Sequence, residues 1–143
     1  MKNTMRRGAA GILAVILLAT VLCLPAGAAV QSNTYILSAT ATISKGTTTG
    51  QLKIAYGILT NQYMDVIGIK KIEVYRSNMS LYRTITGTYA NGLLTSSAST
   101  KSGNYSFTVP TGYSYYCKVT FTATKGGNED TTTVNTALIS PPA

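Results

Sequence analysis

The carboxylate side chains are the first candidates for chemistry, because the 143-residue sequence contains no histidine. Without imidazole, histidine-based acid–base catalysis, Ser-His-Asp and Cys-His nucleophilic sites and imidazole metal sites are excluded. The acidic residues are Asp65, Glu73, Glu129 and Asp130. A glycosidase needs two carboxylates facing each other across a cleft, and only Asp65 and Glu73 lie away from an obvious hairpin tip. Strand alternation directs Glu73 to the solvent face, so we expect no catalytic residue and no enzyme.

Oxygen ligands for a metal occur together only in the run Asn128-Glu129-Asp130. Calcium prefers carboxylate, amide and carbonyl oxygens, which leaves a calcium site as one interpretation of this run. A polar hairpin tip is the favoured interpretation, because three adjacent residues orient too few ligands toward one ion. Asp65 is expected to cap a turn through an Asx hydrogen bond. The sequence thus predicts no metal and no cofactor.

The cysteines are Cys23 and Cys117. Cys23 lies in the N-terminal segment that we expect to be removed, which leaves Cys117 as a single thiol and permits no internal disulfide. A lone cysteine in an exported protein is more often a small buried apolar residue than a reactive group. We expect Cys117 to be buried.

Tyrosine is the most unusual component, with ten tyrosines and no tryptophan. Five fall on predicted inner strand faces: Tyr35, Tyr56, Tyr105, Tyr113 and Tyr115. Others are candidates for the surface, namely Tyr116 beside Lys118 on an outer face, and Tyr63, Tyr75 and Tyr82 near strand ends. Exposed tyrosine suits contact with protein or glycan, although single surface tyrosines are normal. The binding residues therefore stay open.

The first 29 residues read as a cleaved secretory signal peptide of bacterial type. A basic start (Lys2, Arg6 and Arg7) precedes an uncharged apolar run over 8–24 and the small residues of 25–29. We expect cleavage after Ala28 or Ala29, and membrane contact only through the signal peptide before cleavage. An uncleaved anchor and a lipoprotein modified at Cys23 are weaker alternatives, because Pro25 and the small residues favour cleavage and Cys23 follows bulky residues. The protein is predicted to be secreted, with loose wall association left open.

The remaining residues, 30–143, have the length of one domain. They carry nine Lys and Arg against four Asp and Glu, a net charge of +5. The only adjacent pair of basic residues is Lys70-Lys71, so nucleic-acid binding is not expected. A solvated surface accounts for this charge, and weak attraction to an anionic envelope polymer is the more specific functional alternative.

Alternation of apolar and polar residues predicts an all-β fold without helices. About seven strands are expected, at 34–44, 51–59, 67–76, 81–89, 104–109, 113–124 and 131–139. Gly, Asn and Pro predict turns between them, including one at 60–62. The apolar parity changes near Gly68, which indicates a bulge or burial on both faces. Residues 95–102 are the expected flexible loop, and the turn spacing favours a single antiparallel β-sandwich.

The segment 109–119, with Pro110, Gly112, Tyr115 and Cys117, resembles the approach to strand F of fibronectin type III and immunoglobulin-like sandwiches. The resemblance implies that the Tyr115 hydroxyl returns to backbone near the turn. The usual strand-B cysteine is missing, which disfavours a disulfide-bonded immunoglobulin domain.

The wider order of features resembles a family of small secreted Gram-positive proteins known only as a domain of unknown function. The features are Tyr-Ile-Leu-Ser at 35–38, Met-Asp-Val-Ile-Gly at 64–68, Lys-Ile-Glu-Val at 71–74, Gly-Leu-Leu at 92–94, and a tyrosine-rich strand followed by Gly-Gly-Asn-Glu-Asp at 126–130. The resemblance spans 34–139 and implies export and a β-rich fold, without an activity.

The sequence thus predicts a non-catalytic binding or cell-surface interaction module. Its expected partner is an anionic cell-wall polymer, a glycan or a host protein. The alternative is a structural protein that assembles when its threonine-rich terminal strands, 34–44 and 131–139, add to exposed sheet edges.

Overall fold

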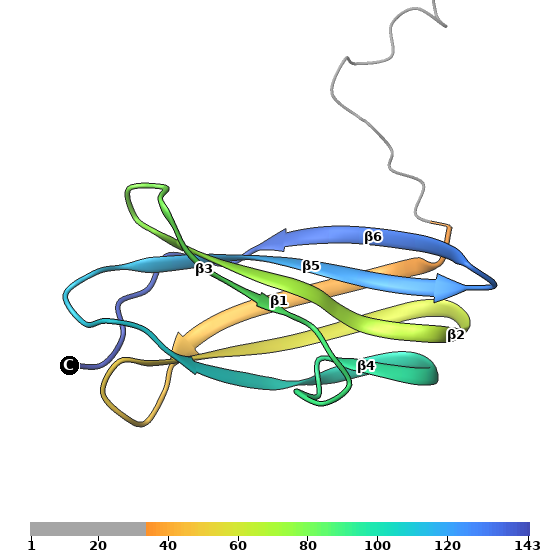
Figure 1. The fold of residues 1–143 in the computed structure, drawn as a ribbon, viewed down its shortest axis with the longest axis horizontal. Coiled ribbons are helices and arrows are strands. Elements are labelled where there is room, and N and C mark those ends of the chain that lie inside the picture. Colours follow the sequence, from red (N-terminus) through yellow and green to blue (C-terminus); the bar gives the residue numbers. More distant parts are fainter. Residues whose placement is uncertain (1–33) are drawn as a thin grey trace, which may run out of the picture. The chain divides into compact units, whose positions relative to one another are not determined.

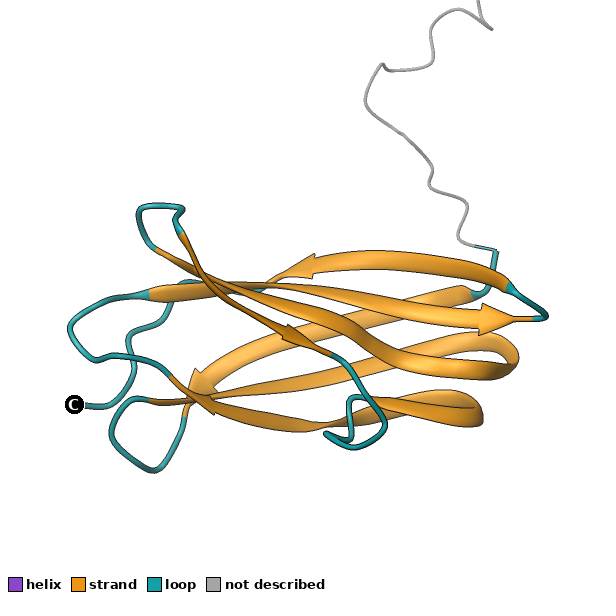
Figure 2. Cartoon of the chain, in the orientation of Figure 1, coloured by secondary structure: helices purple, strands orange, loops and turns teal. Residues whose placement is uncertain are grey.

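A computed structural model describes residues 34–143, and the predicted signal peptide at 1–29 lies outside the described residues. The described part is all-β and antiparallel, as predicted. Its strands are β1 (Ile36–Lys45), β2 (Gln51–Arg76), β3 (Leu81–Thr86), β4 (Leu94–Thr108), β5 (Tyr115–Lys125) and β6 (Asn128–Asn135). Figure 2 shows these strands joined by short loops, with no helix in this part. Accordingly, residues 34–143 contain no helix that could span a bilayer.

β2 is the centre of the sheet. Its first half pairs with β1 and with the second half of β4, and its second half pairs with β5, β3 and the start of β4. β6 pairs with β5. Figure 1 shows β2 running in one direction, bending and returning, so that the antiparallel sheet curls over on itself.

Six strands are present in this part rather than about seven, because the expected turn at 60–62 does not interrupt β2. The hydroxyl oxygen of Thr60 lies 2.9 Å from the carbonyl oxygens of both Gln62 and Ser99. The β2–β4 register shifts between Leu59 and Met64. This local irregularity bends the strand without ending it, and the two predicted strands 51–59 and 67–76 become one.

The expected flexible loop at 95–102 is also wrong, because these residues belong to β4 and pair with β2. The segment lacks large apolar residues, so its side chains do not reveal a strand. β4 pairs only with β2, and backbone hydrogen bonds to that one neighbour suffice to hold a polar edge strand.

The predicted bulge near Gly68 is confirmed. The β2–β5 register shifts between Ile69 and Lys71, which turns Lys70 out to solvent and returns Ile72 to the core. Gly68 itself has φ of +146°, and a Cβ at this position would meet the Leu93 carbonyl oxygen. Only glycine therefore allows β4 to approach β2 this closely.

One hydrophobic cluster lies inside the curl of the sheet and draws residues from both halves of β2. Leu52 and Ile54 come from the first half, and Ile72 and Val74 come from the second half. Phe121 of β5 is likewise fully buried. Burying each such side chain contributes about 1.5–3 kcal/mol, so the core holds the curl closed and fixes which residues face outward.

Candidate functional site

Asp65 and Glu73 do not face each other across a cleft. They are eight residues apart on β2, which corresponds to roughly 25 Å of extended strand. Glu73 forms an ion pair with Lys71 at 3.1 Å. Asp65 does not form the predicted local Asx hydrogen bond. Its carboxylate instead accepts hydrogen bonds from a distant turn, from the Gly126 backbone N–H at 2.8 Å and from Lys125 Nζ at 3.3 Å.

Asp65 therefore holds the β5–β6 hairpin from outside. That hairpin turns through Gly126 and Gly127, whose positive φ values of 56° and 81° suit a two-residue β-turn. The Gly126 hydrogen bond, followed by Lys125, lowers the pKa of Asp65 below its ordinary value. The carboxylate is thus ionised and used in structure.

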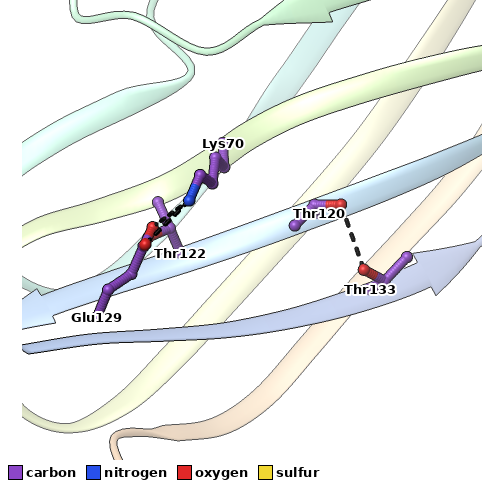
Figure 3. Close-up of polar contacts among 5 residues, drawn as sticks. All are labelled: Lys70, Thr120, Thr122, Glu129 and Thr133. Carbon is purple, nitrogen blue, oxygen red and sulfur yellow. Dashed lines mark hydrogen bonds and ion pairs between the residues drawn. The ribbon is translucent and has the colours of Figure 1, made fainter.

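Glu129 lies on β6, and its carboxylate binds Lys70 in the bulge of β2 (Figure 3). Lys70 Nζ lies 2.8 and 2.9 Å from the two carboxylate oxygens, and the Thr122 hydroxyl donates to Glu129 at 2.8 Å. Hydrogen bonding from Lys70 and from Thr122 lowers the pKa of Glu129, with Lys70 contributing most. Along the same strand pair, the hydroxyls of Thr120 and Thr133 lie 3.2 Å apart (Figure 3).

Asp130 points away from Glu129 and binds the start of β1. One of its oxygens accepts the backbone N–H groups of Tyr35 and Ile36, at 2.9 and 3.1 Å. The carboxylates of Glu129 and Asp130 thus do not converge on one point, which argues against the calcium interpretation of the run 128–130. Within residues 34–143, no cluster of three or more His, Cys, Asp or Glu side chains is arranged to hold a metal.

Cys117 is fully buried on β5, as predicted. Burial disfavours the thiolate and raises the pKa of Cys117 to about 12. The thiol therefore behaves as a small apolar residue of the core.

Tyr115 is fully buried, and its hydroxyl donates a hydrogen bond of 3.0 Å to the Pro110 carbonyl. This is the return to backbone that the strand-F resemblance implied. Tyr56 is also buried, and Tyr35 and Tyr105 pack partly buried against the core, in agreement with their predicted inner faces.

Tyr113 is the exception among the predicted inner tyrosines, because 51% of it is exposed. Gly112 has φ of +87° and β5 begins only at Tyr115. Tyr113 consequently belongs to the preceding turn, where strand alternation does not apply. Tyr63, by contrast, is 68% exposed, as its predicted surface position requires.

Three residues that the sequence suggested separately for surface contact lie together where β2 pairs with β5. Tyr75 and Tyr116 are register partners, and their rings stack with centroids 5.3 Å apart and planes 13° apart. Lys118 Nζ lies 5.1 Å from the centre of the Tyr75 ring. The cross-strand partner of Lys118 is Glu73, whose carboxylate instead pairs with Lys71.

Arg76 follows Tyr75 on β2, faces the opposite side of the strand and is the register partner of the fully buried Tyr115. Its guanidinium lies 5.3 Å from the centre of the Tyr82 ring and 4.8 Å from that of Tyr113. Tyr82 packs partly buried against the core, so it is less exposed than its predicted surface position requires. We call Tyr75, Tyr116 and Lys118 the tyrosine patch, and Arg76, Tyr82 and Tyr113 the arginine site. Each places a cation on aromatic rings, an arrangement able to contact an anionic or ring-shaped partner.

Sequence reasoning missed Arg76 and the exposure of Tyr113. The adjacent Tyr75 and Arg76 gave a signal, since a basic residue beside an aromatic one at a strand end suits surface recognition. The contribution of Tyr113 depends on a turn 37 residues further along the chain, and spacing alone does not reveal that contact. No pocket is present in the part of the chain that the structure describes.

Comparison of the chain with models of known protein families, with curated proteins and with solved structures finds no match. The site is therefore interpreted from its own geometry.

Proposed function

We propose that this protein is a secreted, non-catalytic binding module that contacts its partner through the tyrosine patch. The observation that carries the proposal is the Tyr75–Tyr116 stack with Lys118 Nζ 5.1 Å from the Tyr75 ring. Stacked phenol rings offer apolar area with polar tips, and a lysine beside them adds a positive charge.

The charge distribution favours an anionic partner. Among residues 34–143, each of the three ion pairs uses a lysine, namely Lys70, Lys71 or Lys125. The other basic residues of this part have no carboxylate within 4.0 Å: Lys45, Lys53, Arg76, Arg83, Lys101 and Lys118. All four acidic residues are engaged within the fold. The surplus charge is therefore available to attract an anionic cell-wall polymer or glycan over a range set by salt.

The proposed architecture is a β-sandwich of the immunoglobulin or fibronectin type III kind. One layer would comprise β1, the first half of β2 and the second half of β4. The other would comprise the second half of β2, with β3, β5 and β6. The shared core and the Tyr115–Pro110 hydrogen bond support this architecture.

Export follows from the predicted signal peptide at 1–29, with cleavage after Ala28 or Ala29, and the proposed location is extracellular with loose wall association. Membership of the family of small secreted Gram-positive proteins also remains a proposal.

The test is chromatography of the purified protein on immobilised poly(glycerol phosphate), eluted with salt. Lys118→Ala is expected to weaken binding roughly fivefold, the factor that corresponds to about 1 kcal/mol. Lys53→Ala is the matched control, since it removes another lysine charge that has no acidic partner and lies outside the patch. A Tyr75→Ala/Tyr116→Ala double variant with unchanged far-UV spectrum should lose further retention.

Equal effects of Lys118→Ala and Lys53→Ala would show that net charge alone drives retention and would refute a role for the patch. Absence of any salt-sensitive retention, on this polymer or on acidic glycans, would refute the anionic partner.

A second candidate function is self-assembly through sheet edges. β1 pairs only with β2, and β6 pairs only with β5, so each terminal strand has one edge without a strand partner in the described sheet. Sedimentation velocity over a wide range of protein concentration tests this candidate. Reversible association supports it, and a single monomeric species contradicts it.

A further inference from the structure

Arg76 differs from every other basic residue of the described part in how its side chain is held. The guanidinium lies against the rings of Tyr82 and Tyr113, at 5.3 and 4.8 Å from their centres. Such packing fixes the plane of the guanidinium and reduces the rotamer entropy lost when it binds a ligand. The group is thus pre-organised without an acidic partner.

The Nε atom of Arg76 is buried and has no hydrogen-bond partner among the described residues. It is the one buried side-chain nitrogen or oxygen in this part of the chain in that condition. Leaving a buried charged donor unpaired is unfavourable. No carboxylate of residues 34–143 lies within ion-pair distance to relieve it.

Backbone groups beside the Arg76 side chain already have hydrogen-bond partners of their own. The Arg76 backbone N–H donates to the Ser80 carbonyl, and the next backbone N–H, that of Ser77, donates to the Ser114 carbonyl. The first bond closes the turn after β2, and the second holds that turn against the turn before β5. Tyr113 lies in this second turn and is 51% exposed, so its ring is the part of the site that can rotate most easily.

We propose that Arg76 is an oxyanion-binding centre at the same end of the β2–β5 strand pair as the tyrosine patch. A carboxylate or phosphate group of the anionic partner pairs side-on with the guanidinium, using Nε–H and the neighbouring terminal N–H. The exposed Tyr113 ring rotates to admit it, while the Tyr82 ring, which packs against the core, keeps the guanidinium in place. Planar two-point pairing of this kind is characteristic of arginine and is not available to lysine. The inference rests on the proposed function and names a chemical group of the anionic partner that the protein recognises.

Arg83 supplies a matched control within the same protein. Its guanidinium also lies near an aromatic ring, 5.6 Å from the centre of Phe107, but it contacts one ring instead of two. Its Nε is not a buried, unpartnered atom. An effect specific to the Arg76 site should therefore be absent at Arg83.

The direct test is a nitrogen–proton correlation spectrum of the arginine Nε–H groups in the purified full chain, assigned with Arg76→Lys and Arg83→Lys. Inorganic phosphate and sodium glucuronate are titrated separately at constant ionic strength, with chloride as the reference salt. The Arg76 Nε–H signal is expected to shift saturably with at least one of them, while the Arg83 signal stays in place. Saturation by phosphate alone, by glucuronate alone or by both identifies the source of the oxyanion. No shift at Arg76, or equal shifts at both arginines, overturns the proposal.

Retention on poly(glycerol phosphate) separates this inference from the proposed function. Arg76→Lys preserves the charge and should still weaken binding about tenfold if two-point pairing matters, whereas Arg83→Lys should change it little. If Lys118→Ala weakens retention and Arg76→Lys does not, the oxyanion centre is wrong and the patch stands. If neither variant has an effect, the proposed function itself fails. Should Arg76→Lys not fold, the titration of the unmodified protein still decides the question.

Discussion

The two ends of the β2–β5 strand pair use charged residues in opposite ways. At one end, which we call the carboxylate end, Asp65, Glu129 and Asp130 bind Lys125, Lys70 and backbone N–H groups. At the other end, Lys118 of the tyrosine patch and Arg76 of the arginine site lie on aromatic rings and have no acidic partner in the described residues. Nine residues of β2, roughly 30 Å of strand, separate the register pairs Val66–Thr124 and Tyr75–Tyr116.

The difference indicates which charges serve the fold and which remain for a partner. A carboxylate that receives two or three hydrogen bonds from distant segments ties those segments together, and binding a ligand there would break the ties. A cation on a tyrosine ring keeps unused donors. The carboxylate end is therefore structural, and the tyrosine patch is the surface suited to recognition.

The largest effect is expected at the carboxylate end, from Gly68→Ala. A methyl group would clash with the Leu93 carbonyl oxygen, at a φ of +146° that L-residues rarely adopt. We expect a loss of about 3 kcal/mol or more in the free energy of unfolding, enough to unfold much of the protein. Urea unfolding followed by circular dichroism measures it. Gly112→Ala is the control, because a Cβ there meets nothing within 4 Å although its φ is +87°. Equal losses in the two variants would mean that φ alone, and not the close approach of β4, requires Gly68.

Asp130→Ala tests the tie between β6 and β1. The substitution removes the acceptor of the Tyr35 and Ile36 N–H groups, which lie 2.9 and 3.1 Å from the carboxylate. We expect a loss of about 2 kcal/mol, because hydrogen bonds to charged groups contribute more than neutral ones. Hydrogen exchange should show faster exchange at these two amides and little change in β5. Unchanged protection at both amides would contradict the tie.

Tyr115→Phe is the corresponding test near the tyrosine patch. It deletes the hydroxyl that donates to the Pro110 carbonyl and keeps the buried ring. The expected loss is about 1 kcal/mol, the typical net contribution of one hydrogen bond, because Pro110 is exposed and water can bind its carbonyl in the variant. Tyr105→Phe is the control, because that tyrosine is only partly buried. If Tyr115→Phe unfolds at the same urea concentration as the unmodified protein, the hydrogen bond does not contribute to stability.

The smallest expected effect is the response of the carboxylate end to acid. The folded-state pKa values of Glu129 and Asp65 lie below their ordinary values of 4.5 and 3.8. Their stabilisation is therefore fully present above those ordinary values and is lost as the pH falls through the lower folded-state values. The Glu129 side chain is 40% exposed, so its pair with Lys70 contributes less than about 1 kcal/mol.

Thermal unfolding measured from pH 6 down to the acid range tests this response, with the pH chosen to span both ordinary pKa values. A Glu129→Gln/Asp65→Asn variant should be slightly less stable at pH 6 and should lose less stability on acidification. If the unmodified protein and the variant have parallel pH profiles, these carboxylates are not the source of the acid sensitivity.

Strand periodicity alone predicted much of the fold correctly. Alternation located β1 and β5, the parity change located the bulge beside Gly68, and the glycines predicted the hairpin at 126–127. The polar segment 95–102 was misassigned, because backbone hydrogen bonds hold this edge strand and its side chains show no apolar alternation.

The candidate site was only partly predictable. Tyr116, Lys118, Tyr75 and Tyr82 were recognised one by one from their positions on outer faces or near strand ends. The grouping of Tyr75, Tyr116 and Lys118 depends on the β2–β5 register, and a shift of one residue in that register would put Tyr116 on the opposite face from its partner.

Local sequence thus determined the all-β class, most turns, the burial of Cys117 and Tyr115, and the absence of imidazole chemistry, because each follows from residue type and a period of two. Tertiary structure decided that β2 bends instead of ending, that Asp65 and Asp130 tie distant segments, and that Arg76 meets Tyr113. These features depend on contacts between residues 37 to 95 positions apart, and only the curl of the sheet around its core brings such residues together.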